Sequence, residues 1–101
     1  IMLELKNDNL NEVLSSNENV FVMYGASWCG ACKMSKPKVN RLAGENQSVQ
    51  FVYVDAEHMI DSRELAGKLS NLPTFVAFKN GEVIEKEAGT KSIEKVLNVL
   101  K

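Results

Sequence analysis

Cysteine, proline and tryptophan are scarce in this chain of 101 residues, which contains two cysteines, two prolines and one tryptophan. Two cysteines cannot form the multi-disulfide framework of small secreted domains. Neither charge sign dominates, because 12 basic and 13 acidic residues give a formal net charge of −1. The sequence therefore lacks the excess of basic residues that is typical of nucleic-acid-binding proteins. No apolar run approaches the roughly 20 residues of a membrane span, so we expect no membrane partner.

The N-terminal segment Ile1-Met2-Leu3-Glu4-Leu5-Lys6 lacks the charged and apolar regions of an export signal. The expected location is therefore the reducing cytoplasm, and only a processed signal would change that expectation. In that compartment, paired cysteines are more often catalytic or metal-binding than structural. The length predicts one domain over residues 1–101, with a modest core.

Both cysteines lie in one short segment, Trp28-Cys29-Gly30-Ala31-Cys32-Lys33. Two intervening residues is the spacing of a dithiol that can close into a small disulfide ring and reopen. The apolar residues before it read as a strand and those after it as a helix, which places the pair at a helix N-terminus. Unpaired N–H groups and the helix dipole favour a thiolate there. The pattern therefore predicts a thiol–disulfide redox protein.

Hydrophobic periodicity predicts elements in the order β-α-β-α-β-α-β-β-α. The expected strands cover residues 2–5, 20–24, 49–54, 74–79 and 82–86, and the last two flank the hairpin signal Asn80-Gly81. Capping-box patterns that begin at Asn9 and Asp61 predict the starts of the first and third helices. The second helix is expected over 32–43 with a kink at Pro37, and an apolar stripe over 93–100 marks the last. This order predicts an α/β fold, with a mixed five-stranded central sheet and helices on both faces.

The element order and the cysteine motif after the second strand resemble thioredoxin over nearly the whole chain. Leu72-Pro73-Thr74 is similar to the family's cis-proline loop, Phe78-Lys79-Asn80-Gly81 to its hairpin, and Gly89 to its loop beside the active site. The resemblance implies a thioredoxin fold and a general protein-disulfide reductase that works through a reversible Cys29–Cys32 disulfide. It also implies that Pro73 is cis and positions the backbone of residue 72 to pair with an extended substrate strand.

Cys29 is expected to be the nucleophile that attacks a substrate disulfide, because it comes first at the helix N-terminus. Cys32 lies one helical turn later and is expected to attack the mixed disulfide and release the reduced substrate. Gly30 leaves room for a partner's backbone to approach the sulfur. The residues expected to bind the substrate are Trp28, Gly30, Ala31, Leu72, Pro73 and Gly89. No cofactor is expected.

Three positions depart from the family pattern. Ala31 stands where typical thioredoxins have proline. Met23 stands where they have a buried aspartate, and Phe51 where they have the lysine that partners it. Both members of a buried ion pair are thus apolar here, which is physically coherent because removing only one would leave an uncompensated buried charge. Met23 and Phe51 are expected to be core residues without a chemical role.

Other functions are compatible with the same residues. The cysteines could form half of a zinc site, but His58 is the only histidine available as a further ligand, so no metal is expected. His58 is instead expected to be exposed near a helix entry. The chain could also be a clamp module that stabilises a partner enzyme without using its thiols, or an exported thiol oxidant. The leading prediction is a monomeric reductase that acts on protein disulfides and is recharged by thioredoxin reductase.

Overall fold

The computed structural model describes all 101 residues and contains a five-stranded sheet with strand order β1-β3-β2-β4-β5. The strands are β1 (Leu3–Glu4), β2 (Asn19–Gly25), β3 (Gln50–Asp55), β4 (Thr74–Lys79) and β5 (Glu82–Ala88). β3 pairs in parallel with β1 and β2, whereas β4 pairs antiparallel with β2 and β5. The expected mixed sheet and thioredoxin fold are therefore confirmed.

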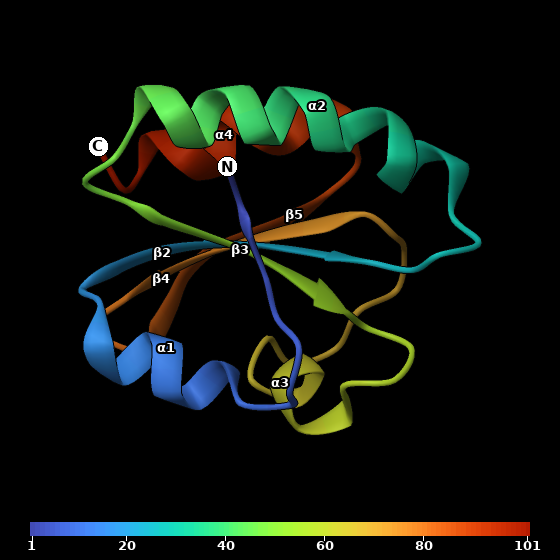
Figure 1. Ribbon diagram of the computed structural model, residues 1–101, viewed down its shortest axis with the longest axis horizontal. Helices are drawn as coiled ribbons and strands as arrows, with labels where there is room; N and C mark the ends of the chain where they lie inside the picture. The colour runs from blue at the N-terminus through green and yellow to red at the C-terminus, as the bar shows by residue number, and fades with distance from the viewer.

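Helices cover both faces of this sheet (Figure 1). The helices α2 (Gly30–Glu45) and α4 (Ile93–Asn98) lie on one face, and α1 (Leu10–Ser16) and α3 (Ile60–Glu64) lie on the other. A 3-10 turn, η1 (Thr90–Ser92), leads into α4. Each face has its own apolar cluster, the larger beneath α2 and α4 and the smaller beneath α1 and α3. Both cysteines belong to the larger cluster. No helix is both long enough and apolar enough to cross a bilayer.

Helix α2 begins two residues earlier than the pattern predicts. It starts at Gly30, so Cys29 becomes its N-cap residue and its side chain accepts a hydrogen bond from the Cys32 backbone. Pro37 lies inside the helix, which continues to Glu45. The kink expected at Pro37 stays a prediction. The early start matters because it puts the first sulfur at the end of the helix, where unpaired N–H groups gather.

Hydrogen bonds join the N-terminal ends of α1 and α3. They also show that the prediction of a capping box beginning at Asp61 is wrong. Asp61 lies inside α3, and Asp8 accepts hydrogen bonds from the backbone N–H groups of Asp61 and Ser62 at 2.9 and 2.7 Å. In return, the Ser62 hydroxyl accepts the N–H of Leu10 at 3.0 Å. Asn9 does precede the first helix, but its side chain makes no cap hydrogen bond. Helix α3 also ends at Glu64, so Leu65 lies at its C-cap and Leu69 beyond it.

The hairpin between β4 and β5 forms where the sequence indicates. Asn80 and Gly81 have φ angles of 52° and 83°, which are the left-handed values that a two-residue hairpin turn needs. Glycine adopts such angles at no steric cost, and asparagine is among the few side-chain-bearing residues that tolerate them. The turn brings β5 back along β4 and carries the chain to Gly89, on the way to η1.

Candidate active site

The two cysteines form a disulfide at the junction of β2 and α2. Their Cα atoms are 5.2 Å apart, within the usual range for a disulfide. The backbone N–H of Cys32 donates a hydrogen bond to the Cys29 sulfur at 3.2 Å. Cys29 is 7% exposed and Cys32 only 1%. Cys29 is thus the more exposed of the two residues, and Cys32 is enclosed by the core.

The electrostatic surroundings of Cys29 favour negative charge on its sulfur. The first turn of α2 contains no acidic residue, so no like charge opposes a thiolate at the helix end. The partial positive charge of the helix N-terminus and the N–H of Cys32 both stabilise one. A cysteine in such a position is a better nucleophile at neutral pH than an ordinary thiol, because a larger fraction of it is ionised.

The loop before β4 lies beside the segment that follows β5. The Leu72–Pro73 peptide bond is cis, as the resemblance implies. The N–H of Gly89 donates to the carbonyl of Pro73 at 2.9 Å, which fastens the two segments together. Gly89 has a φ of 95°, an angle that side-chain-bearing residues rarely adopt. Two of the residues expected at the substrate site are thus in direct contact.

Trp28 lines a surface hollow of about 520 Å³ together with Leu72. Its side chain is not part of the core, since 68% of the residue is exposed. Gly30 and Ala31 are exposed at the start of α2, next to the cysteines in sequence. Half of the hollow's lining is apolar, and the full set is Trp28, Ala56, Glu57, Arg63, Leu69, Ser70, Asn71 and Leu72. The sequence prediction included only Trp28 and Leu72 from this set, because the others carry no motif.

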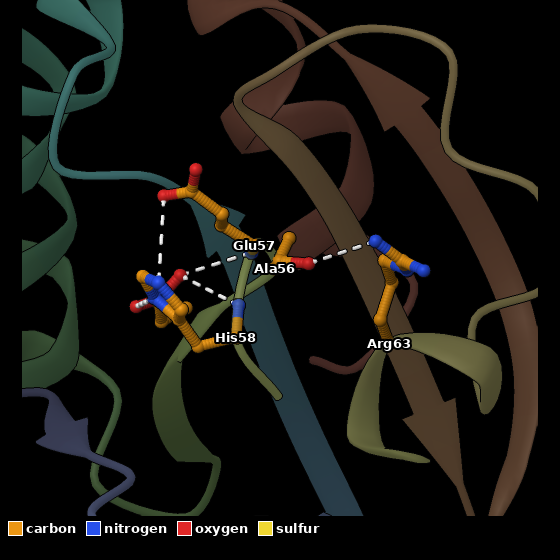
Figure 2. A network of polar contacts seen from close by, with 5 residues as sticks. Ala56, Glu57, His58 and Arg63 are labelled. Atoms are coloured by element: carbon orange, nitrogen blue, oxygen red, sulfur yellow. Dashed lines mark hydrogen bonds and ion pairs between the residues drawn. The ribbon is translucent and has the colours of Figure 1, made fainter. Parts of the chain in front are cut away.

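A polar network crosses the segment between β3 and α3 (Figure 2). His58 Nδ1 lies 2.8 Å from Asp55 Oδ2, and Asp55 Oδ1 accepts the backbone N–H groups of Glu57 and His58. Arg63 donates to the carbonyl of Ala56 at 3.1 Å. This network holds the segment that supplies Ala56, Glu57 and Arg63 to the hollow.

The charges in this network shift two pKa values in opposite directions. The hydrogen bond and charge of Asp55, with a smaller effect from Glu57, raise the pKa of His58 above its ordinary value. Burial opposes ionisation of Asp55, but hydrogen bonds from the His58 ring and from the amides of Glu57 and His58 hold its pKa below the usual range. Ligand atoms of Asp55, Glu57 and His58 lie within 4.8 Å of one another, the one histidine-containing group close enough to hold a metal. His58 itself is exposed, as expected.

Met23 and Phe51 are core residues, as the sequence predicts. Met23 is fully buried, and the Phe51 ring lies 5.0 Å from the Phe21 ring, centroid to centroid. Two residues near Cys32 could not be read from the motifs: Gly25, where a Cβ would lie 3.1 Å from the Cys32 sulfur, and Tyr53, whose hydroxyl would lie 2.8 Å from the same Cβ. A glycine at the end of a buried strand is a signal of close approach, and it could have indicated the first of these residues.

A disulfide at a helix N-terminus, beside a cis-proline loop and an exposed tryptophan, has one evident chemistry, the exchange of dithiols and disulfides. This chemistry places the chain among the thiol–disulfide oxidoreductases. The chain belongs to the thioredoxin family, because the family's sequence profile, described as Thioredoxin, matches residues 1–101. The Cys29–Cys32 pair stands at the family's active-site position. The expected protein-disulfide reductase class is thereby confirmed.

Curated relatives and solved structures agree with this assignment. Thioredoxin H2 of Arabidopsis thaliana is 36% identical over 85% of this chain, which spans 64% of that protein. Thioredoxin of Mycoplasma genitalium is 33% identical over 89% of this chain, which spans 87% of that protein. The X-ray structure of Fasciola hepatica thioredoxin superposes with a TM-score of 0.88 at 27% identity, covering 99% of this chain and all of that one.

Proposed function

We propose that residues 1–101 act as a single thioredoxin domain that reduces disulfides in a broad set of proteins, with Cys29 as the nucleophile and Cys32 as the resolving thiol. The observation that carries this assignment is the position of Cys29 as the N-cap of α2, with the N–H of Cys32 directed at its sulfur. The difference in exposure supports the same order, since a substrate sulfur must reach the attacking thiolate but not the resolving one.

The proposed cycle moves two electrons from the protein dithiol to the substrate. The Cys29 thiolate attacks one substrate sulfur, the substrate S–S bond breaks, and the other substrate sulfur leaves as a thiolate. Cys32, having lost its proton, then attacks the Cys29 sulfur, the mixed disulfide breaks, and the second substrate thiolate leaves. The substrate becomes a dithiol, and the protein is left with the Cys29–Cys32 disulfide that the structure contains.

We propose that the substrate lies across the face that surrounds Cys29. Trp28 and Leu72 supply apolar contact in the hollow, and the peptide groups before Pro73 pair with an extended substrate segment. At the exposed helix start, Gly30 has no side chain and that of Ala31 is a single methyl group, so a substrate backbone can approach the sulfur closely. Gly89 holds the cis-proline loop in place through its hydrogen bond to Pro73.

We further propose that the protein acts as a monomer in the cytoplasm, takes part in electron transport to protein disulfides, and is recharged by thioredoxin reductase. Family membership supports this electron donor. Trp28, just before α2, and Met34, in the N-terminal part of α2, are exposed and therefore available to such partners when the chain is monomeric.

Reduction of insulin by dithiothreitol, catalysed by the protein, tests the proposed function. We expect activity in the wild type and its loss in Cys29→Ser and Cys32→Ser, with circular dichroism showing that both variants fold. A mixed disulfide with insulin that accumulates only in Cys32→Ser identifies Cys29 as the nucleophile. A reduction potential of about −270 mV supports a reductase, whereas one of about −120 mV would indicate the exported thiol oxidant. Full activity toward a partner enzyme without either cysteine would indicate the clamp.

A further inference from the structure

Tyr53 occupies a space beside the Cys32 sulfur that exists because residue 25 is a glycine. A Cβ atom on Gly25 would lie 2.8 Å from the Tyr53 hydroxyl oxygen and 3.1 Å from Cys32 Sγ. The hydroxyl and the sulfur therefore face one small space at the end of β2, and the sum of these two distances is the upper limit of their separation. A side chain at position 25 would displace the phenol, since ring atom Cε1 lies 2.9 Å from the same point.

The phenol ring is held in this position from the solvent side as well. Lys36 Nζ lies 3.8 Å from the centre of the Tyr53 ring, a cation–π contact, and it also pairs with Glu4 at 3.3 Å. Tyr53 also packs against the larger apolar cluster, which includes Cys32. The ring is thus fixed between an ion pair and the core, with its hydroxyl in the space beside Gly25 that the Cys32 sulfur also faces.

The Tyr53 hydroxyl is a hydrogen-bond donor without a partner in the protein. Burial, reinforced by the charges of Asp55 and Glu4, raises the pKa of Tyr53, so the phenol keeps its proton at neutral pH. The chain's other tyrosine, Tyr24, differs, because its hydroxyl donates to the carbonyl of Ser62 at 2.8 Å. A protonated phenol beside a sulfur is suited to stabilise negative charge on that sulfur.

We propose that the Tyr53 hydroxyl donates a hydrogen bond to the Cys32 sulfur whenever that sulfur is a thiolate. The stabilised thiolate is present in a larger fraction of molecules when Cys32 attacks the mixed disulfide. In the reverse direction, a donor thiolate attacks Cys29, the Cys29–Cys32 bond breaks, and Tyr53 stabilises Cys32 as the leaving thiolate. The phenol keeps its proton throughout.

This role differs from that of a buried carboxylate, which would accept the Cys32 proton. Met23 is the partner of Tyr53 across the β2–β3 ladder and is fully buried, but its side chain can take no proton. Of the three heavy atoms nearest to a Cβ at Gly25, the Tyr53 hydroxyl oxygen is the only oxygen or nitrogen, and the Cys32 sulfur is another of the three. The inference rests on the proposed exchange cycle of Cys29 and Cys32.

The pKa of Cys32 tests the inference without any need for turnover. It is measured by the ultraviolet absorbance of the thiolate in Cys29→Ser, with and without Tyr53→Phe. The phenylalanine variant keeps the ring, its contact with Lys36, and the nearby charges of Glu4 and Asp55. We expect the loss of the hydroxyl to make Cys32 a weaker acid, on the order of tenfold in its ionisation constant. An unchanged ionisation constant overturns the proposal.

Tyr24→Phe is the matched control, because it removes a hydroxyl from a buried tyrosine whose partner is Ser62. It should lower stability without moving the Cys32 pKa, and an equal shift in both variants would indicate a structural effect instead. As a second measurement, dithiothreitol should reduce the disulfide of otherwise wild-type Tyr53→Phe more slowly than that of the wild type. Insulin reduction by Cys29→Ser or Cys32→Ser would contradict the proposed function. A Cys32 pKa that Tyr53→Phe leaves unchanged would contradict the role of Tyr53 alone.

Discussion

The backbone N–H of Cys32 points at the sulfur of Cys29, with a nitrogen–sulfur distance of 3.2 Å. The N–H is unpaired within the helix because Cys32 lies in the first turn of α2. The same residue thus provides the donor that stabilises the first sulfur and, in the proposed cycle, the thiol that attacks it. The two sulfurs consequently differ: one is polarised by a helix end, and the other is enclosed in the core.

This asymmetry predicts that only Cys29 is alkylated rapidly in the reduced protein at neutral pH. We expect its rate to exceed that of Cys32 by about tenfold or more, because thiolate fraction and access both favour it. Brief treatment with iodoacetamide followed by mass mapping measures both sites. Cys32→Ser should keep the fast reaction and Cys29→Ser should lose it. Dominant labelling at Cys32 would reverse the assigned roles.

The reciprocal contacts between α1 and α3 predict that Asp8→Ala destabilises the protein much more than Asp61→Ala. Asp8 accepts two backbone N–H groups of α3, whereas the Asp61 side chain is not a cap. Denaturant melts compare the two variants, with Asp8→Asn retaining part of the stability as an acceptor. Equal losses in Asp8→Ala and Asp61→Ala would show that the cap contributes nothing.

The Asp8 cap is also expected to be sensitive to acid. Hydrogen bonds from Ser62 and Asp61 lower the pKa of the Asp8 carboxyl. A depressed folded-state pKa contributes stability that is present above the unfolded value, about 3.9, and is lost as pH falls through the folded value. The difference between the wild type and Asp8→Ala should therefore shrink in acid.

The contact between His58 and Asp55 predicts a raised pKa for the single histidine of the chain. Asp55→Asn should lower it toward the ordinary value of about 6.5, because it removes the charge and weakens the hydrogen bond. Glu57→Gln is the control and should have the smaller effect, since its carboxylate lies 3.9 Å from the ring. Nuclear magnetic resonance of the ring protons follows the titration. A His58 pKa that does not respond to Asp55→Asn would contradict the contact.

The stability effect of His58 follows from the same shift. A raised folded-state pKa contributes stability that is fully present below the unfolded value of about 6.5 and is lost as pH rises through the folded value. Stability of the wild type relative to Asp55→Asn should therefore decline from mildly acidic to mildly alkaline pH.

Most of the fold could be predicted from the sequence because its signals are local. The hairpin depends on Asn80 and Gly81 themselves, and the position of the disulfide depends on two cysteines in one helical turn. The start of α3 could not be predicted in this way. The capping box at Asp61 is a local pattern, whereas the actual cap is Asp8, which lies 53 residues earlier in the chain.

Local sequence patterns could likewise predict only part of the candidate site. The motif residues Cys29, Trp28 and Pro73 could be recognised because their sequence context is distinctive. Tyr53 could not, because a tyrosine in a strand reads as an ordinary half-buried residue. Its place beside Cys32 depends on the parallel pairing of β3 with β2 and on the missing side chain of Gly25. Such a placement is a property of tertiary packing, which no local pattern contains.

The absence of a buried charge at position 23 leads to the last prediction. Met23 is fully buried in the larger apolar cluster, and Phe51, at the family's lysine position, offers no counter-charge. Met23→Asp should destabilise the oxidised and reduced forms alike by about 1–3 kcal/mol even with the carboxyl neutral. The loss should grow with pH, because burial raises the folded-state pKa of the new carboxyl. The unfolded chain then binds fewer protons between the two pKa values, so stability falls as pH rises.

Denaturant melts of Met23→Asp at pH 5 and pH 8 measure this growth, and Met23→Asn is the matched control. Asparagine is similar in size to aspartate but does not titrate, so its deficit relative to the wild type should be the same at both pH values. The aspartate deficit should exceed the asparagine deficit at pH 8 and approach it at pH 5. A deficit for Met23→Asp that is no larger at pH 8 would show that water or a charged group reaches position 23. The apolar packing around Met23 argues against such access, since the residue has no exposed surface.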